Sequence, residues 1–184
     1  MRRFEIICLT LGVICFFTPA IADQTDPRLG GLFAQLGEVS GPIDAAPIES
    51  QIWTIWHETS DHAAQSLLQR GIDAMRTGDN NSALKTFDQL VEIAPDFAEG
   101  WNKRATVQFL LGNFDQSIKD IANTLNLEPR HFGALSGLGL VYMSLNDLER
   151  ALISFEAALA VSPHLVSSRI NAEAIRQILQ GREI

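Results

Sequence analysis

The stretch ALKTFDQLVEIAP, residues 83–95, decides the fold, because the chain uses the same pattern twice more. The stretches SIKDIANTLNLEP (117–129) and ALISFEAALAVSP (151–163) follow at intervals of 34 residues. Each begins with a small residue, has a bulky apolar residue four positions later and ends in proline. A period of this length is typical of solenoid and array architectures, in which each repeat is one supersecondary unit.

The register extends upstream of these three stretches. Twenty-four positions before each terminal proline the chain has a small residue, namely Gly71, Ala105 or Gly139. Twenty-eight positions before it stands an apolar residue, namely Leu67, Trp101 or Leu135. Turn and cap residues lie in between, at Gly78-Asp79-Asn80, Gly112-Asn113 and Asn146-Asp147. We therefore predict six helices, near residues 62–77, 81–93, 98–111, 115–127, 132–145 and 148–161.

This pattern resembles the tetratricopeptide repeat, which has the same period and places an apolar or aromatic residue, Gly or Ala, then Ala, Phe and Pro at fixed offsets. The resemblance implies an all-α fold, an α-solenoid of helix-turn-helix tetratricopeptide repeats with a C-terminal capping helix. It divides this part of the chain into three repeats and a final helix with its tail, over residues 64–97, 98–131, 132–165 and 166–184.

The segment from Leu165 to Gln180 is predicted to form that last, amphipathic helix. Its expected apolar stripe consists of Val166, Ile170, Ala174, Ile175, Ile178 and Leu179, with Arg169, Glu173 and Arg176 facing out. An open stack of repeats needs a terminal helix that covers its last apolar face and is polar outside. We interpret the helix as a plain cap, and a partner-binding helix is the alternative.

Residues 23–63 fit the repeat pattern only weakly. Asp26-Pro27 is typical of a capped helix start with proline in the first turn, and a short helix is expected over residues 29–36. Ser40-Gly41-Pro42 ends this helix, and Pro47 is expected to open a second one. Two interpretations stay open, a degenerate N-terminal repeat or a helical cap.

Trp53 and Trp56 lie one period before Phe87 and Leu90, which favours the degenerate repeat. Indole rings are large apolar bodies, and they pack in protein cores more often than they cage a ligand. We therefore expect both tryptophans to be packing residues.

The first 22 residues have the pattern of a secretory signal peptide. Arg2-Arg3 supply a positive start, Ile6 to Phe17 an apolar run, and Ala20-Ile21-Ala22 a cleavage site. The run is about half of the ~20 residues that a transmembrane helix needs, so an uncleaved anchor is the less favoured alternative. Cleavage after Ala22 removes both cysteines and changes the formal charge from -8 to -9. We expect a periplasmic or secreted protein with no membrane insertion after cleavage, and favour a bacterial periplasm over eukaryotic secretion.

Composition and motifs argue against several functional classes. The chain has 22 Asp and Glu against 14 Lys and Arg and no basic block, which argues against nucleic-acid binding. His57 and His62 are five residues apart, whereas a helical zinc motif needs four, so we expect no metal. His131 and His164 follow repeat prolines and are expected to be solvated turn residues. The sequence has neither a phosphate-binding glycine loop nor a nucleophile elbow, so we expect neither a cofactor nor an enzyme.

The resemblance also implies where a partner binds. In tetratricopeptide arrays the first helix of each repeat lines a concave groove, and partners lie along it. The predicted partner contacts are Leu68, Ile72, Met75, Arg76, Glu99, Asn102, Phe109, Leu110, Ser136, Leu140 and Met143, with Gln65, Thr106, Gly133 and Ser144 at the remaining groove positions. Seven of these fifteen residues are large and apolar, which favours an apolar strip of a protein or peptide as the partner. The alternative is that these residues touch only neighbouring helices.

Relatives that bind chaperone C-termini clamp a terminal carboxylate with Lys, Asn and Arg side chains. The matching positions here are Leu68, Ile72, Lys103, Gly133 and Gly137, so a chaperone-tail adaptor is not expected.

Our leading hypothesis is an exported, non-enzymatic scaffold that binds a protein or peptide segment in the groove. The alternative is a structural, self-assembling dimer of the cell envelope, formed through the open ends of the stack or through the Trp53–Trp56 segment.

Overall fold

The structure, a computed structural model, describes residues 23–182, which form helices and turns and no strand. A short 3-10 turn (Asp23–Thr25) is followed by α1 (Pro27–Glu38), α2 (Pro42–Trp56), α3 (His62–Arg76), α4 (Asn80–Ile93), α5 (Ala98–Leu110), α6 (Phe114–Leu127), α7 (Phe132–Ser144), α8 (Leu148–Val161) and α9 (Val166–Arg182). In this described part, no helix is long and apolar enough to cross a membrane. The predicted signal peptide and its two cysteines, Cys8 and Cys15, lie outside it.

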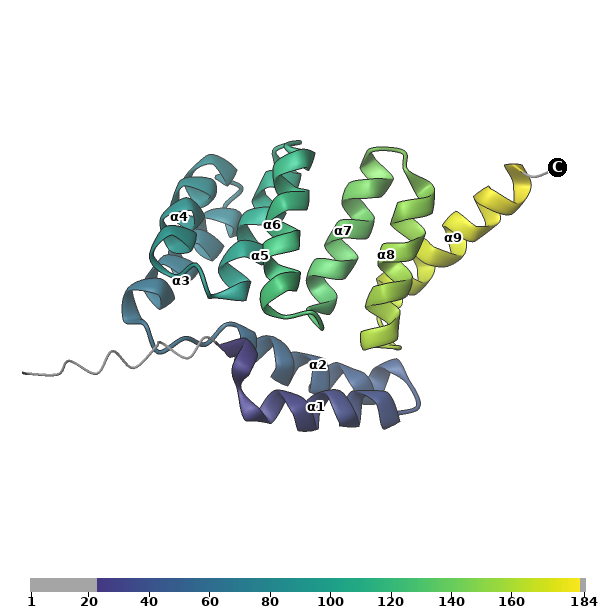
Figure 1. Cartoon of the computed structure of the whole chain (residues 1–184), viewed down its shortest axis with the longest axis horizontal. Coiled ribbons are helices and arrows are strands. Elements are labelled where there is room, and N and C mark those ends of the chain that lie inside the picture. Colours follow the sequence, from purple (N-terminus) through teal and green to yellow (C-terminus); the bar gives the residue numbers. More distant parts are fainter. Residues whose placement is uncertain (1–22, 183–184) are drawn as a thin grey trace, which may run out of the picture.

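Helices α3 to α8 form three antiparallel pairs that stack side by side (Figure 1). Each of the six predicted helices is present, and every end lies within one residue of its predicted place. The turns within the pairs use backbone conformations with positive φ, at Gly78, Gly112 and Asn146. Asp79 and Asp147 then cap the second helices of their pairs with their side chains. The predicted all-α solenoid is therefore confirmed.

The small residues of the repeat pattern mark close contacts inside each pair. A Cβ atom on Gly71 would overlap the ring of Phe87, and one on Gly139 would lie 2.6 Å from the ring of Phe155. Phe87 also shares a buried cluster with Val107 of the following repeat. The aromatic rings therefore join the two helices of a repeat and connect that repeat to the next.

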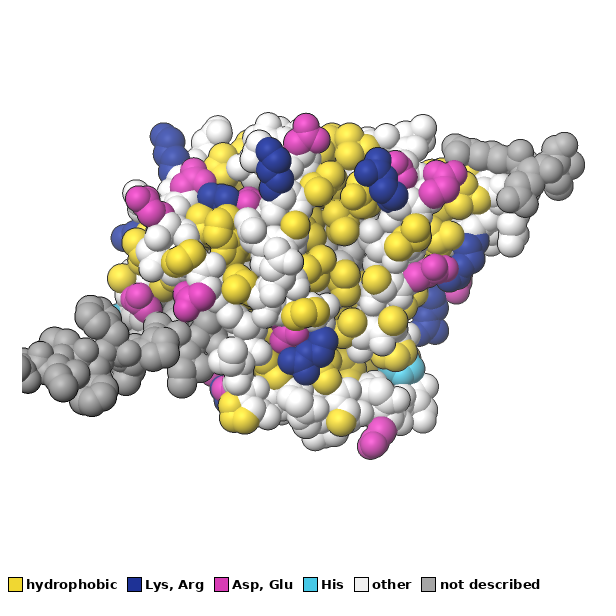
Figure 2. Space-filling view, in the orientation of Figure 1, with side chains coloured by type: hydrophobic (Ala, Val, Ile, Leu, Met, Phe, Trp, Pro, Cys, Tyr) yellow, Lys and Arg dark blue, Asp and Glu magenta, His cyan; other side chains and the backbone are white. Residues whose placement is uncertain are grey.

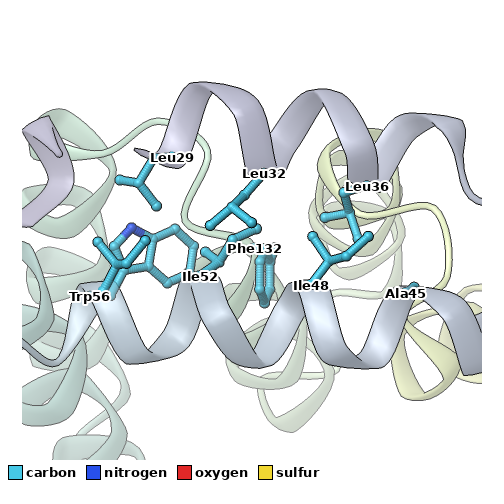
Figure 3. Packing of buried hydrophobic residues seen from close by; sticks show 9 residues of the cluster. Leu29, Leu32, Leu36, Ala45, Ile48, Ile52, Trp56 and Phe132 are labelled. Carbon is cyan, nitrogen blue, oxygen red and sulfur yellow. The ribbon is translucent and has the colours of Figure 1, made fainter. Parts of the chain in front are cut away.

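The helical pair α1–α2 does not continue the stack. It runs across the ends of the solenoid helices, beneath α5 to α8 in the view of Figure 1. Leucines of α1 face the isoleucines and Trp56 of α2, and Phe132 from the start of α7 enters the same cluster (Figure 3). Val161 and Leu165 from the end of α8 and the following loop pack against it. The interpretation as a stacked extra repeat thus differs from the structure, because these apolar faces are covered by the edge of the solenoid.

Helix α2 also begins earlier than expected. Pro42 occupies its first turn, and Pro47 lies inside the helix instead of opening it. A proline in a helix leaves the carbonyl four residues earlier without its partner. That carbonyl belongs to Ile43, which is 87% exposed, and Pro47 is exposed as well, so water can hydrogen-bond the free group.

The predicted apolar stripe of α9 is divided in two. Ile175 is buried against α8 and Leu179 packs on the same cluster, together with Ala172 from outside the predicted stripe, whereas Val166, Ile170 and Ile178 remain exposed. The expectation of one continuous covered stripe was wrong, because the apolar positions span too wide an arc of the helix for α8 to cover all of them.

Candidate functional site

A pocket of about 210 Å³ opens between the first helices of the second and third repeats, α5 and α7. Its lining residues are Asn102, Ala105, Thr106, Phe109, Ser117, Ile121, Gly133, Ser136, Gly137 and Leu140. The opening exists because Ala105 on α5 and Gly137 on α7 are small, which uncovers Ile121 of α6 behind them. Only the Cδ1 atom of Ile121, at 3.9 Å, would meet a Cβ on Gly137.

The polar groups around this pocket are largely engaged within the chain. The hydroxyl of Thr106 donates to the Asn102 carbonyl, and that of Ser117 donates to the Ala105 carbonyl. The Asn102 amide donates to Glu99 Oε2 over 2.8 Å. Ser136 Oγ donates to the Phe132 carbonyl and also bonds Ser168 of α9. With these donors engaged, the lining favours an apolar occupant.

Beside the pocket lies a buried cluster of charged and polar groups centred on Glu99, which is 1% exposed. Oε2 accepts hydrogen bonds from Asn102 and, over 3.0 Å, from Nε2 of His131. Oε1 lies 2.9 Å from Nζ of Lys103 and 3.2 Å from Nε2 of His57. These are ion-pair contacts, and Oε1 accepts no well-aligned hydrogen bond. One carboxylate therefore joins α5 to α2 and to the start of α7.

This environment keeps Glu99 ionised. Burial alone would raise the pKa of its carboxyl group, but the opposing effects are together larger. The charge of Lys103, the hydrogen bond from His131 and the electrostatic influence of His131 and His57 lower the pKa from 4.5 to about 2. The carboxylate is thus a fixed negative charge at the junction between the hairpin and the solenoid.

His131 is fully buried, and the expectation of a solvated turn residue was wrong. Its Nδ1 caps α7 by accepting from the backbone N–H of Ala134, so the ring proton that reaches Glu99 is carried on Nε2. Its ring stacks on Trp56, with the centroids 4.0 Å apart and the planes within 9°. His164 is half-buried and bonds the carbonyl of Val39. Both histidines of the repeat turns therefore attach the α1–α2 hairpin.

Trp53 of this hairpin covers one end of the predicted groove. A Cβ on Gly133 would overlap the Trp53 indole, and Nζ of Lys103 lies 5.5 Å from the centroid of the ring. The expected packing role of both tryptophans agrees with these contacts. The cover restricts the open part of the groove to the half that contains Phe109, Leu110 and Leu140.

The structure brings together only part of the predicted contact set. Asn102, Phe109, Ser136 and Leu140 line the pocket, and Thr106 and Gly133, two of the remaining groove positions, line it as well. Leu110 is exposed close to them in sequence.

The remaining predicted contacts lie elsewhere. Leu68 and Glu99 are buried and cannot meet a partner, so these two predictions were wrong. Ile72, Met75 and Met143 pack against the cores of their own repeats, as the alternative interpretation expected. Arg76 is exposed and pairs with Asp73 on the same helix.

Sequence reasoning missed the Glu99 cluster, although one signal for it was available. Glu99 and His131 occupy the starts of the first helices of successive repeats. Stacked repeats place the starts of their first helices side by side, so the repeat spacing could have predicted that Glu99 and His131 lie close together. Within residues 23–182, no group of three or more His, Cys, Asp and Glu side chains is arranged to hold a metal ion.

Figure 2 shows hydrophobic side chains gathered over the middle of the visible face, with most charged groups toward its edges. Leu110, Leu140 and Ile153 are among the large hydrophobic residues that remain exposed. A stack of helical pairs with a small apolar pocket between first helices defines an α-solenoid.

Comparison with known proteins names the family. A model described as tetratricopeptide repeat matches residues 68–125 and 104–165, together more than half of the chain. A TPR repeat-containing protein of Rhizobium etli is 36% identical over 136 residues, covering 74% of this chain and 67% of that protein. The small glutamine-rich tetratricopeptide repeat-containing protein 2 of Saccharomyces cerevisiae is 26% identical over 98 residues, 53% of this chain and 28% of that protein. The chain belongs to the tetratricopeptide repeat family.

Solved structures share the fold. The first TPR of Spaghetti (RPAP3) bound to the HSP90 peptide SRMEEVD has a TM-score of 0.62 at 22% identity, covering 64% of this chain and 93% of that one. A crystal structure of MamA has a TM-score of 0.62 at 18% identity and covers 85% of this chain and 84% of that one. At these identities the likeness concerns the fold alone.

Proposed function

We propose that this protein is an exported, non-enzymatic scaffold that binds an apolar anchor of a protein or peptide segment in the pocket between α5 and α7. The observation that carries the proposal is a pocket with an apolar floor whose polar neighbours are engaged inside the chain. Binding of peptides by family members of the same fold, such as the HSP90 peptide on Spaghetti, supports this type of partner.

The size of the pocket favours a side chain over a free small molecule. Small-molecule sites are typically about 300–1,000 Å³, whereas this one is about 210 Å³ and lies open on the groove side. One large apolar side chain matches that space, and its burial is worth about 1.5–3 kcal/mol. Asn102 also lines the pocket, and its side-chain amide is held by donation to Glu99 Oε2.

Filling the pocket is expected to abolish binding without unfolding the protein. In Gly137→Leu the new side chain points into free space, and the helix gains a better helix former. Leu140→Glu places a charge on the rim instead. A peptide library displayed on phage and selected on the wild type should enrich sequences that share one large apolar residue. Both variants should bind the selected peptides at least about tenfold more weakly.

Ile153→Glu is the matched control, because Ile153 is 64% exposed on α8 and does not line the pocket. It should bind the selected peptides as the wild type does. Equal binding by folded Gly137→Leu would show that the segment lies elsewhere.

We further propose export with cleavage after Ala22, on the basis of the pattern of residues 1–22. Protein purified from the exported fraction should begin at Asp23 and contain no cysteine. Intact-mass measurement and thiol titration check this result. A purified chain that retains Met1 and both thiols would favour the anchor instead.

Self-assembly is the second candidate function, and of its two predicted routes the Trp53–Trp56 segment is not available. Trp56 is 1% exposed and Trp53 lies on Gly133, so the Trp53–Trp56 segment is occupied within the chain. The other route is association through the open end of the stack, and the exposed apolar residues of α9 favour this route.

A further inference from the structure

Helix α9 has an apolar stripe that nothing in the described chain covers. Val166, Ile170 and Ile178 are 56%, 60% and 48% exposed, and the small residue Ala174 between them is exposed as well. Residues four apart lie above one another on a helix, so these four form one continuous stripe. It lies roughly opposite the face that Ala172 and Ile175 bury against α8.

The repeat register explains the position of this stripe. One period of 34 residues after Ser136 and Leu140 come Ile170 and Ala174, so α9 takes the place of the first helix of another repeat. The positions where a second helix would pack carry Arg169, Glu173 and Arg176, whose charges oppose such a partner helix. The stripe therefore continues the groove-facing side of α7 at the C-terminal end of the stack, where the last turns of α9 extend beyond α8 (Figure 1).

We propose that a second copy of this chain covers the stripe, with the two α9 helices packed antiparallel about a two-fold axis. In this arrangement Val166 meets Ile178 of the second copy, and Ile170 meets Ala174 of the second copy. The small side chain of Ala174 near the axis lets the two helices approach closely. The same patch serves both copies, as in the commonest symmetric dimers.

The charges beside the stripe favour this orientation. Arg169 and Glu173 flank the same side of it, and neither makes an ion pair with another side chain that the structure describes. In an antiparallel pair, equivalent sides face each other, so Arg169 faces Glu173 of the second copy on both sides of the axis. A parallel pair would instead bring this side against Ser167 and Asn171, which are uncharged.

A pairing through one helix from each copy is a small interface, in the range below about 1,200 Å² where association is weak. Self-association is therefore expected at micromolar concentration. The inference rests on the self-assembly candidate and is separate from peptide binding. Leu140→Glu tests the groove and Ile170→Glu tests α9, so failure of one leaves the other intact.

Sedimentation equilibrium of the exported, purified protein from about 1 to about 200 μM measures this dimer. We expect a reversible monomer–dimer equilibrium in the wild type and in Ile153→Glu, the control for an exposed isoleucine on α8. Ile170→Glu should raise the dissociation constant at least about tenfold, because it buries a charge at the axis. A wild type that stays monomeric, or Ile170→Glu that associates as well as the wild type, would overturn the proposal.

A charge exchange tests the orientation. Arg169→Glu and Glu173→Arg should each weaken the dimer about fivefold, because each places like charges across the axis, and the double variant should restore it. Circular dichroism should be unchanged in every case, since both side chains are exposed. A double variant as weak as the single ones would overturn the antiparallel arrangement. If the wild type is monomeric and its peptide binding depends on Ile170, the stripe belongs to the groove partner instead.

Discussion

Glu99→Ala should lower the free energy of unfolding by about 3–5 kcal/mol, the loss typical of removing one partner from a buried charge network. The variant leaves Nζ of Lys103 and Nε2–H of His131 without their shared acceptor. His131 has no access to water that could replace it, since it is fully buried. Because the same carboxylate contacts His57, the α1–α2 hairpin should detach first.

Urea denaturation followed by circular dichroism at neutral pH measures the loss. Tryptophan fluorescence reports mainly the hairpin, because two of the three tryptophans, Trp53 and Trp56, lie at its junction with α7. Glu58→Ala is the control, since the pair of Glu58 with Arg28 is about half exposed and should be worth less than about 1 kcal/mol. A loss in Glu99→Ala no larger than that of the control would contradict the role assigned to this cluster.

The contribution of Glu99 should also depend on pH with a definite sign. Its pKa is about 2 in the folded protein and near 4.5 without the fold, so the folded state favours the ionised form. The resulting stability is present in full above about pH 4.5 and is lost as the pH falls toward 2. The stability difference between wild type and Glu99→Gln should thus be constant from pH 7 to about 5 and shrink below it. A difference that grows on acidification would contradict the lowered pKa.

Gly71→Ala should cost about 1–3 kcal/mol by overpacking, even though alanine is the better helix former. The added methyl group would overlap the ring of Phe87. The chain itself shows how the two positions adjust to each other. Where the middle repeat has Ala105 in place of glycine, its second helix has Ile121 in place of phenylalanine.

Phe87→Ile should therefore relieve Gly71→Ala. Alone, Phe87→Ile leaves a cavity and is expected to cost about 1–2 kcal/mol. In the double variant, which copies the pair of the middle repeat, the total cost should be at least about 1 kcal/mol smaller than the sum of the single costs. Gly31→Ala is the matched control, because no atom lies within 4 Å of its new Cβ and the change should stabilise α1 slightly. Strict additivity of the two single changes would contradict the contact.

Most of the solenoid could be predicted from the sequence because its information is local and repeated. Asp61, Asp79 and Asp147 cap helices through N–H groups two or three residues away. Gly78 and Gly112 supply the positive φ of their turns. Capping and turn signals of this kind act within one helical turn, and the 34-residue period repeats the pattern in three copies.

The candidate site was only partly predictable. The register placed Asn102, Phe109, Ser136 and Leu140 on one face, and the structure joins them in one pocket. The depth of that pocket depends on Gly137 and on Ile121 from another helix, a combination that no single helix pattern contains.

The repeat pattern alone predicts the unit of this fold, which is a pair of helices of fixed length with its turn. The place of the α1–α2 hairpin, and with it the burial of Glu99 and His131, follows from three-dimensional packing. The physical reason is that a helix pattern states which face is apolar but not what covers it. Trp56 packs against His131 and Phe132, which lie far from it in the sequence, and only packing in three dimensions brings these residues together.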